Sequence, residues 1–280
     1  MKNNKKRIFS WMISATMVIT VCSSAVFSSA DEEVPADHLV INQVYGGGNS
    51  GVTKPKDEIR ISHAFVELYN PTGEDINLSG YSLQYAPTGD VWSKLDLTGT
   101  IKARSSFLVR GASYEFEPSA FPAECKYTIA DEVVDQNWEG QYFNNKGLKI
   151  ALLSNTDALG VINPFDTDGA GAKSAGYVDM FGVAGNDPDM TIDGCETEYI
   201  TGKGEKEGQS KKNAFRRINF SDTDNNKTDF APVKYGNNYE ELSDLLELTE
   251  LTDEQQAEKA ALLEKIAGNK PRSRDRKSVV

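Results

Sequence analysis

The stretch FVELYNPTGEDINLSGYSLQ at residues 65–84 decides the fold class of this chain. Near its start, Val66 and Leu68 fall on one face of an extended segment, and Leu83 near its end lies in a second alternating segment. Between the two, residues 70–73 (Asn-Pro-Thr-Gly) supply a proline that fixes φ and a glycine that permits a positive φ. The stretch therefore predicts two half-buried strands joined by a turn.

The same pattern continues on both sides of this stretch. Further short β-rich segments lie between polar turns at residues 39–45, 95–101, 107–110, 148–152, 177–183 and 214–220. A series of short strands without a long helical pattern indicates a sandwich or a barrel. We predict that residues 37–235 form an all-β, antiparallel sandwich whose core includes Val66, Leu68, Tyr81, Leu83, Ile150 and Leu152.

The predicted domain is longer than the roughly 100 residues of a typical sandwich of this kind. The surplus falls into three predicted insertions, at residues 47–62, 112–146 and 184–212. Long loops on a rigid scaffold commonly carry binding sites. We therefore look to the insertions for function.

Residues 65–84 resemble the lamin-tail domain, the module of nuclear lamins that also occurs in many bacterial extracellular proteins. Residues 41–47 (INQVYGG) resemble the first strand of the bacterial version, residues 98–109 its middle strands, and residues 222–230 the motif that closes many bacterial copies. The resemblance implies an immunoglobulin-like β-sandwich that serves as a non-catalytic binding or scaffolding module of a larger exported protein. The long insertions depart from the pattern, so no ligand preference follows from it.

Residues 1–30 have the features of a signal peptide. The positive segment contains Lys2, Lys5, Lys6 and Arg7. An apolar stretch follows at residues 8–21, and Ser28-Ser29-Ala30 form a small-residue cleavage site. The alternative is an uncleaved anchor, although serine and threonine weaken a span of about 20 apolar residues. We expect a secreted or surface-displayed bacterial protein with no membrane span after cleavage.

The chain is acidic, with a formal net charge of -12 at pH 7. Removal of the four cations of residues 1–30, which carry no acidic residue, would lower this to about -16. Such a charge repels phosphate backbones, so nucleic acid is disfavoured as a partner. We expect an extracellular or cell-surface ligand.

The C-terminal region has a different character. Residues 239–268 are predicted to be helical, as a linker or the start of a further region, and residues 269–280 form a tail. The codons GAT CGG AAG AGC GTC GTG, which begin a common sequencing adapter, encode residues 275–280 (DRKSVV). We interpret these residues as adapter sequence, with a natural basic tail as the alternative, and expect the natural chain to continue beyond about Arg274.

Recognisable catalytic constellations are absent from the sequence. His38 and His63 are the only histidines, and no zinc-protease, serine-elbow, phosphate-loop or Cys-x-x-Cys motif occurs. We therefore predict no catalytic residue. The alternative is an accessory domain of an exported hydrolase, a nuclease or phosphoesterase, whose catalytic domain lies downstream.

Two further features suggest sites. Oxygen donors at Ca²⁺-like spacing form a candidate calcium loop consisting of Asp222, Asp224, Asn226 and Asp229, with a weaker set at Asp166 and Asp168. The loop is no EF-hand, because Lys227 and Val233 stand where glycine and glutamate are needed. Turns closed by the same side chains are the alternative. In an oxidising compartment we predict a disulfide between Cys125 and Cys195, with two free thiols as the alternative.

Overall fold

The computed structural model describes residues 34–47, 59–113, 125–127, 129–185, 189–201, 208–210 and 213–234. All of these belong to the compact unit Glu33–Val280. The predicted signal peptide, the predicted helices at 239–268 and the tail at 269–280 lie outside the described residues.

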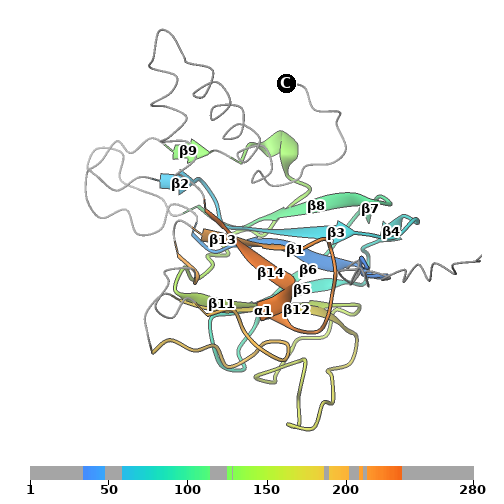
Figure 1. The fold of residues 1–280 in the computed structure, drawn as a ribbon. Helices are drawn as coiled ribbons and strands as arrows, with labels where there is room; N and C mark the ends of the chain where they lie inside the picture. The colour runs from blue at the N-terminus through green and yellow to red at the C-terminus, as the bar shows by residue number, and fades with distance from the viewer. Residues whose placement is uncertain are drawn as a thin grey trace, which may run out of the picture. The chain divides into compact units, whose positions relative to one another are not determined.

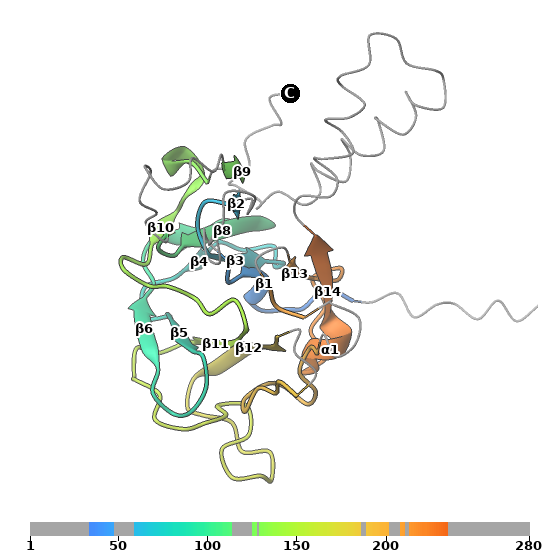
Figure 2. The same ribbon diagram turned by 90° about the vertical axis from the view of Figure 1, so that its left-hand side faces the viewer.

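Two stacked sheets form the domain (Figures 1 and 2). The six-stranded sheet has the order β10-β8-β3-β1-β13-β14, with bounds Gln136–Asn137, Ser105–Arg110, Phe65–Asn70, Val40–Tyr45, Asn213–Arg217 and Phe230–Lys234. The four-stranded sheet has the order β12-β11-β5-β6, with bounds Tyr177–Ala184, Gly147–Leu153, Ser82–Ala86 and Ser93–Asp96. The described residues confirm the predicted all-β sandwich of immunoglobulin-like type.

Short elements complete the fold. Two small two-stranded sheets pair β2 (Ile59–Ile61) with β9 (Cys125–Tyr127) and β4 (Ile76–Asn77) with β7 (Thr100–Ile101). The helices are η1 (Asp131–Val133) and α1 (Asn226–Asp229). Neither helix, nor any other in the described part of the chain, has the length and apolar character that crossing a membrane would require.

The stretch at 65–84 carries the chain from one layer to the other. Its first strand, β3, belongs to the six-stranded sheet, and β5 follows in the four-stranded sheet. Asn70 holds the turn between them, because its Nδ2 donates to the Glu74 carbonyl (2.7 Å) and its Oδ1 accepts from the Thr72 amide (3.0 Å). The crossing places the apolar faces of both strands in one core.

The core lies between the two sheets. Of the predicted core residues, Val66, Leu68, Leu83, Ile150 and Leu152 are fully buried there. Tyr81 is only partly buried, because it precedes β5 and packs against the margin of the core.

A second apolar cluster covers the other face of the six-stranded sheet. It joins strand residues to the insertions and consists of Tyr45, Ile61, Phe65, Leu108, Ile129, Ala214 and Val233. The six-stranded sheet is therefore covered on this face too, and Ile61 and Ile129 show that parts of the insertions at 47–62 and 112–146 pack on it.

The described sheets are antiparallel, as predicted, apart from two strand pairs. The pairs β8–β10 and β2–β9 run parallel, while the other strand pairs named above are antiparallel. Parallel neighbours need a long crossover connection, and the predicted insertion at 112–146 supplies one between β8 and β10.

Candidate functional site

A buried ion pair lies at the side of the sandwich where β12 and β13 approach each other. Asp179 on β12 and Arg217 on β13 both have side chains that are 0% exposed. The Arg217 Nη2 donates to both carboxylate oxygens of Asp179, each at 2.7 Å. Because side chains alternate between the two faces of a strand, Asp179 lies on the same core-facing side as Phe181, and Arg217 on the same side as Phe215.

Every nitrogen of the Arg217 guanidinium has acceptors. Its Nη1 donates to Asp222 Oδ1 (3.2 Å), to Asp229 Oδ2 (3.3 Å) and to the Ser221 carbonyl (2.9 Å). Its Nε donates to the Ile41 carbonyl (3.0 Å) on β1. One cation therefore ties the first strand to β12 and to the loop that follows β13.

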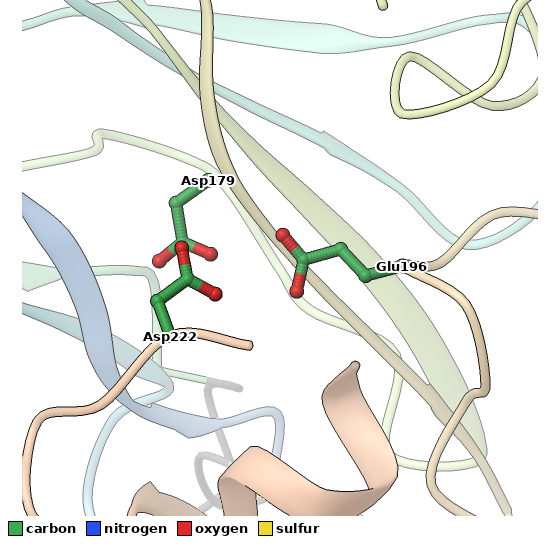
Figure 3. Close-up of side chains that lie close together, drawn as sticks. All are labelled: Asp179, Glu196 and Asp222. Atoms are coloured by element: carbon green, nitrogen blue, oxygen red, sulfur yellow. The ribbon is translucent and has the colours of Figure 1, made fainter. Parts of the chain in front are cut away.

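Glu196 brings a third carboxylate close to Asp179 and Asp222. One oxygen from each lies within 4.8 Å of the others, a spacing that a metal ion can bridge (Figure 3). The Glu196 oxygens, however, accept from the Tyr177 hydroxyl (2.5 Å) and from Asn226 Nδ2 (2.8 Å). Since protein donors already reach all three carboxylates and Arg217 contacts two of them, a metal would have to displace the guanidinium. Among the described residues, the cluster, an ion-pair network, is occupied by protein donors and centred on the Arg217 ion pairs.

Ionisation of two carboxylates in the network is disfavoured. Burial raises the pKa of Asp179 to about 6, against the opposing effect of Arg217. Burial, followed by the charges of Asp179 and Asp222, raises the pKa of Glu196 well above its usual value. Burial and the closeness of the carboxylates to one another therefore disfavour ionisation of Asp179 and Glu196.

His38 pairs with the same network from the N-terminal side. Its Nε2 lies 3.0 Å from Asp222 Oδ2, and this hydrogen bond raises the pKa of His38 to about 9. Burial opposes ionisation of Asp222, but the His38 hydrogen bond and the charge of Arg217 outweigh it and lower its pKa to about 2. Both groups are charged at neutral pH, so the segment before β1 is held to the loop after β13.

The structure does not bring the four predicted calcium ligands together. Asp224 pairs with Lys173 at the surface (2.9 Å), whereas Asp222 faces His38 and Arg217. Asn226 Oδ1 accepts from the Gly182 amide (2.8 Å), and Asp229 accepts from the Thr223 amide (2.9 Å). Among the described residues, the carboxylates of this loop do not form a cluster of their own. Calcium at this loop would have to break these contacts.

The alternative interpretation, turns closed by their own side chains, describes both acidic loops. Asp222 Oδ1 accepts from the Asp224 amide (3.2 Å). In the second loop, Asp166 accepts from the Gly171 amide (2.9 Å) and Asp168 from the Ala170 amide (2.8 Å). The hydrogen bonds that Asp168 accepts from the Ala170 and Ala172 amides lower its pKa. The carboxylates thus stabilise loop conformation.

The predicted disulfide is not present in the structure. Cys195 is a free thiol, and burial together with the nearby Glu196 raises its pKa to about 11. Cys125 belongs to β9, but its side chain lies outside the described residues.

An open pocket of about 380 Å³ lies at the end of β8, and none of its lining residues belongs to the ion-pair network. Its lining consists of His63, Arg110, Gly111, Ala112, Ser113, Asn137, Trp138, Glu139, Gly140 and Tyr142. Most of these residues belong to the predicted insertion at 112–146. The sequence pointed to that insertion and to His63, but not to Arg110. Arg110 lies beside Asn137 only because β8 pairs with β10.

The comparison with protein families agrees with this architecture. The sequence model of the Lamin Tail Domain matches residues 33–178. Among solved structures, the chain is similar to a DUF4876 family protein from Bacteroides thetaiotaomicron, at 13% identity and a TM-score of 0.37, over 70% of this chain and 71% of that one. No curated protein matches the sequence. Because the Lamin Tail Domain match covers more than half of the 280 residues, the chain belongs to the lamin tail domain family.

Proposed function

We propose that this chain is a non-catalytic binding module of an exported bacterial protein, with a ligand outside the cell or on its surface. The observation that carries the proposal is the pocket at the end of β8, which the insertion at 112–146 builds onto a doubly covered sheet. A rigid scaffold that presents a loop-lined pocket is a common design for binding.

The chemistry of the titratable groups supports a role without catalysis. Asp179 and Glu196, whose pKa values are raised, have no exposed surface, so a substrate proton is out of their reach. His38 is committed to its ion pair with Asp222. His63 lines the pocket, but its Nδ1 already makes a hydrogen bond with the Ser62 hydroxyl (2.7 Å), and that hydroxyl accepts from the Ile129 amide (2.9 Å).

Binding of the fluorescently labelled full chain to bacterial cell envelopes tests the proposal. We expect saturable binding that Ala112→Trp, which fills the pocket, abolishes. Ala158→Trp, in the exposed loop between β11 and β12, serves as the matched control and should bind like the wild type.

The same preparation should leave DNA, phosphoesters, peptides and glycans intact, with or without Mg²⁺, Ca²⁺ or Zn²⁺. Turnover that follows the chain through purification, or envelope binding that is absent or unaffected by Ala112→Trp, would overturn the proposal. Activity that needs additional downstream sequence would assign this module to an exported hydrolase as its accessory domain.

A further inference from the structure

The pocket at the end of β8 combines a fixed cation with groups that both donate and accept hydrogen bonds. Arg110 is held in place by Asn137 Oδ1 (3.0 Å), by the Ile129 carbonyl (3.0 Å) and by Asp131 (2.7 Å). A guanidinium has five N–H donors, and these contacts require three of them. Arg110 is thus a rigid donor at the pocket wall.

His63 contributes an uncharged ring. Burial, followed by the charge of Arg110, lowers the pKa of His63, so the imidazole is neutral at pH 7. Ser62 Oγ accepts from the Ile129 amide (2.9 Å) and lies 2.7 Å from His63 Nδ1. A neutral imidazole has one N–H donor and one nitrogen acceptor.

The rest of the lining supplies acceptors and an aromatic face. Glu139 is exposed and adds a carboxylate, and Asn137 carries an amide that can both donate and accept. Tyr142 is 42% exposed and adds an aromatic ring to the lining. Trp138, also in the lining, is largely buried and packs edge-on against Phe143.

The electrostatic balance argues against an anionic ligand. Arg110 is already paired with Asp131, and Glu139 adds a negative charge to the same lining. The chain as a whole carries a formal net charge of -12, which repels anions. The mixed donors and acceptors of this lining suit a ligand that bears many hydroxyl groups and has C–H faces that can pack on an aromatic ring.

We propose that the pocket lined by Arg110, Glu139 and Tyr142 binds a neutral sugar unit of an extracellular glycan. The volume of about 380 Å³ is near the lower end of the roughly 300–1,000 Å³ of small-molecule sites, which suits a mono- or disaccharide unit. The inference rests on the proposed binding function and names the ligand class for that same pocket.

A glycan array probed with the labelled full chain tests this assignment, with neutral glycans, uronic-acid glycans and sulfated glycans as separate arms. We expect binding to at least one neutral glycan, confirmed by titration with the free sugar. Tyr142→Ala should weaken it roughly 2- to 12-fold, and Glu139→Gln roughly tenfold. Ala112→Trp should abolish binding, and the control Ala158→Trp should keep it.

The outcomes separate the ligand class from the function. Binding to no neutral glycan, binding confined to acidic glycans, or neutral-glycan binding that Ala112→Trp leaves intact would each overturn the sugar assignment. If Ala112→Trp still abolished envelope binding in such a case, the binding function would stand and the sugar assignment would be wrong. Loss of envelope binding altogether would overturn the function itself.

Discussion

Replacement of Arg217 by methionine should be among the most damaging single substitutions in this domain. It removes the cation from Asp179, Asp222 and Asp229, whose side chains are 0%, 6% and 1% exposed. Removing one partner of a buried ion pair costs about 3–5 kcal/mol. His38 still pairs with Asp222, and Thr223 still donates to Asp229. The loss therefore falls mainly on Asp179, and we expect about 3–5 kcal/mol in the free energy of unfolding.

Urea unfolding followed by intrinsic fluorescence measures this cost. With a denaturant slope of about 2 kcal/mol per molar, the midpoint should fall by roughly 2 M. Since small domains have only about 5–15 kcal/mol of stability, the variant should be close to unfolding at room temperature. Lys102→Met, which breaks the exposed pair with Asp75, is the control and should leave the midpoint unchanged.

The cost should also depend on pH. The pKa of Asp179 is already raised to about 6, and loss of Arg217 removes an opposing effect and raises it further. A folded-state pKa above the unfolded value means that ionisation costs stability as pH rises through it. The deficit of Arg217→Met should therefore be smaller at pH 5 than at pH 8. A variant within 1 kcal/mol of the wild type, or a deficit equal at both pH values, would refute the network as described.

Three further predictions follow from residues described above. Leu68→Ala removes a fully buried side chain and should cost about 2–5 kcal/mol in urea unfolding; a cost under 1 kcal/mol would contradict the core assignment. Because the pKa of His38 is raised from 6.5 to about 9, its stabilisation is complete below pH 6.5 and lost as pH rises through 9. His38→Gln should remove this alkaline slope, and identical slopes would argue against the ion pair. Because Asn226 and Asp229 are committed to internal bonds, the Tm should be equal in millimolar calcium and in chelator; a rise in calcium that Asp224→Asn abolishes would reinstate the predicted calcium loop.

Period-two alternation was sufficient to predict the strands that form the core. Val66 with Leu68, and Ile150 with Leu152, alternate with less apolar residues, and each pair is buried between the sheets. The strand β14 was missed because it contains Pro232, which weakens any strand pattern. Its position at the sheet margin explains how a proline is tolerated there.

The sequence contains a sign of the ion-pair network that the alternation of apolar residues alone does not explain. Asp179 and Arg217 each stand two residues from a buried phenylalanine, so both charges occupy core-facing positions of predicted strands. Two opposite charges in such positions suggest a buried pair, but only the fold shows that β12 and β13 meet. For the acidic loop, composition alone could not separate calcium ligands from turn-forming side chains, because both need the same oxygens at the same spacing.

The position of β1 in the middle of the six-stranded sheet has a consequence for how the chain folds. The residues of its neighbour β13 that pair with it lie more than 170 positions later, and the Ile41 carbonyl accepts from an N–H of Arg217, 176 positions later. Contacts of such long range slow folding, because the connecting chain must be ordered before the contact forms. Until β13 has been synthesised, β1 has a bare edge that can pair with another chain. A fragment that ends before Asn213, and so lacks β13, should therefore aggregate, even though it contains most of the strands of the sandwich.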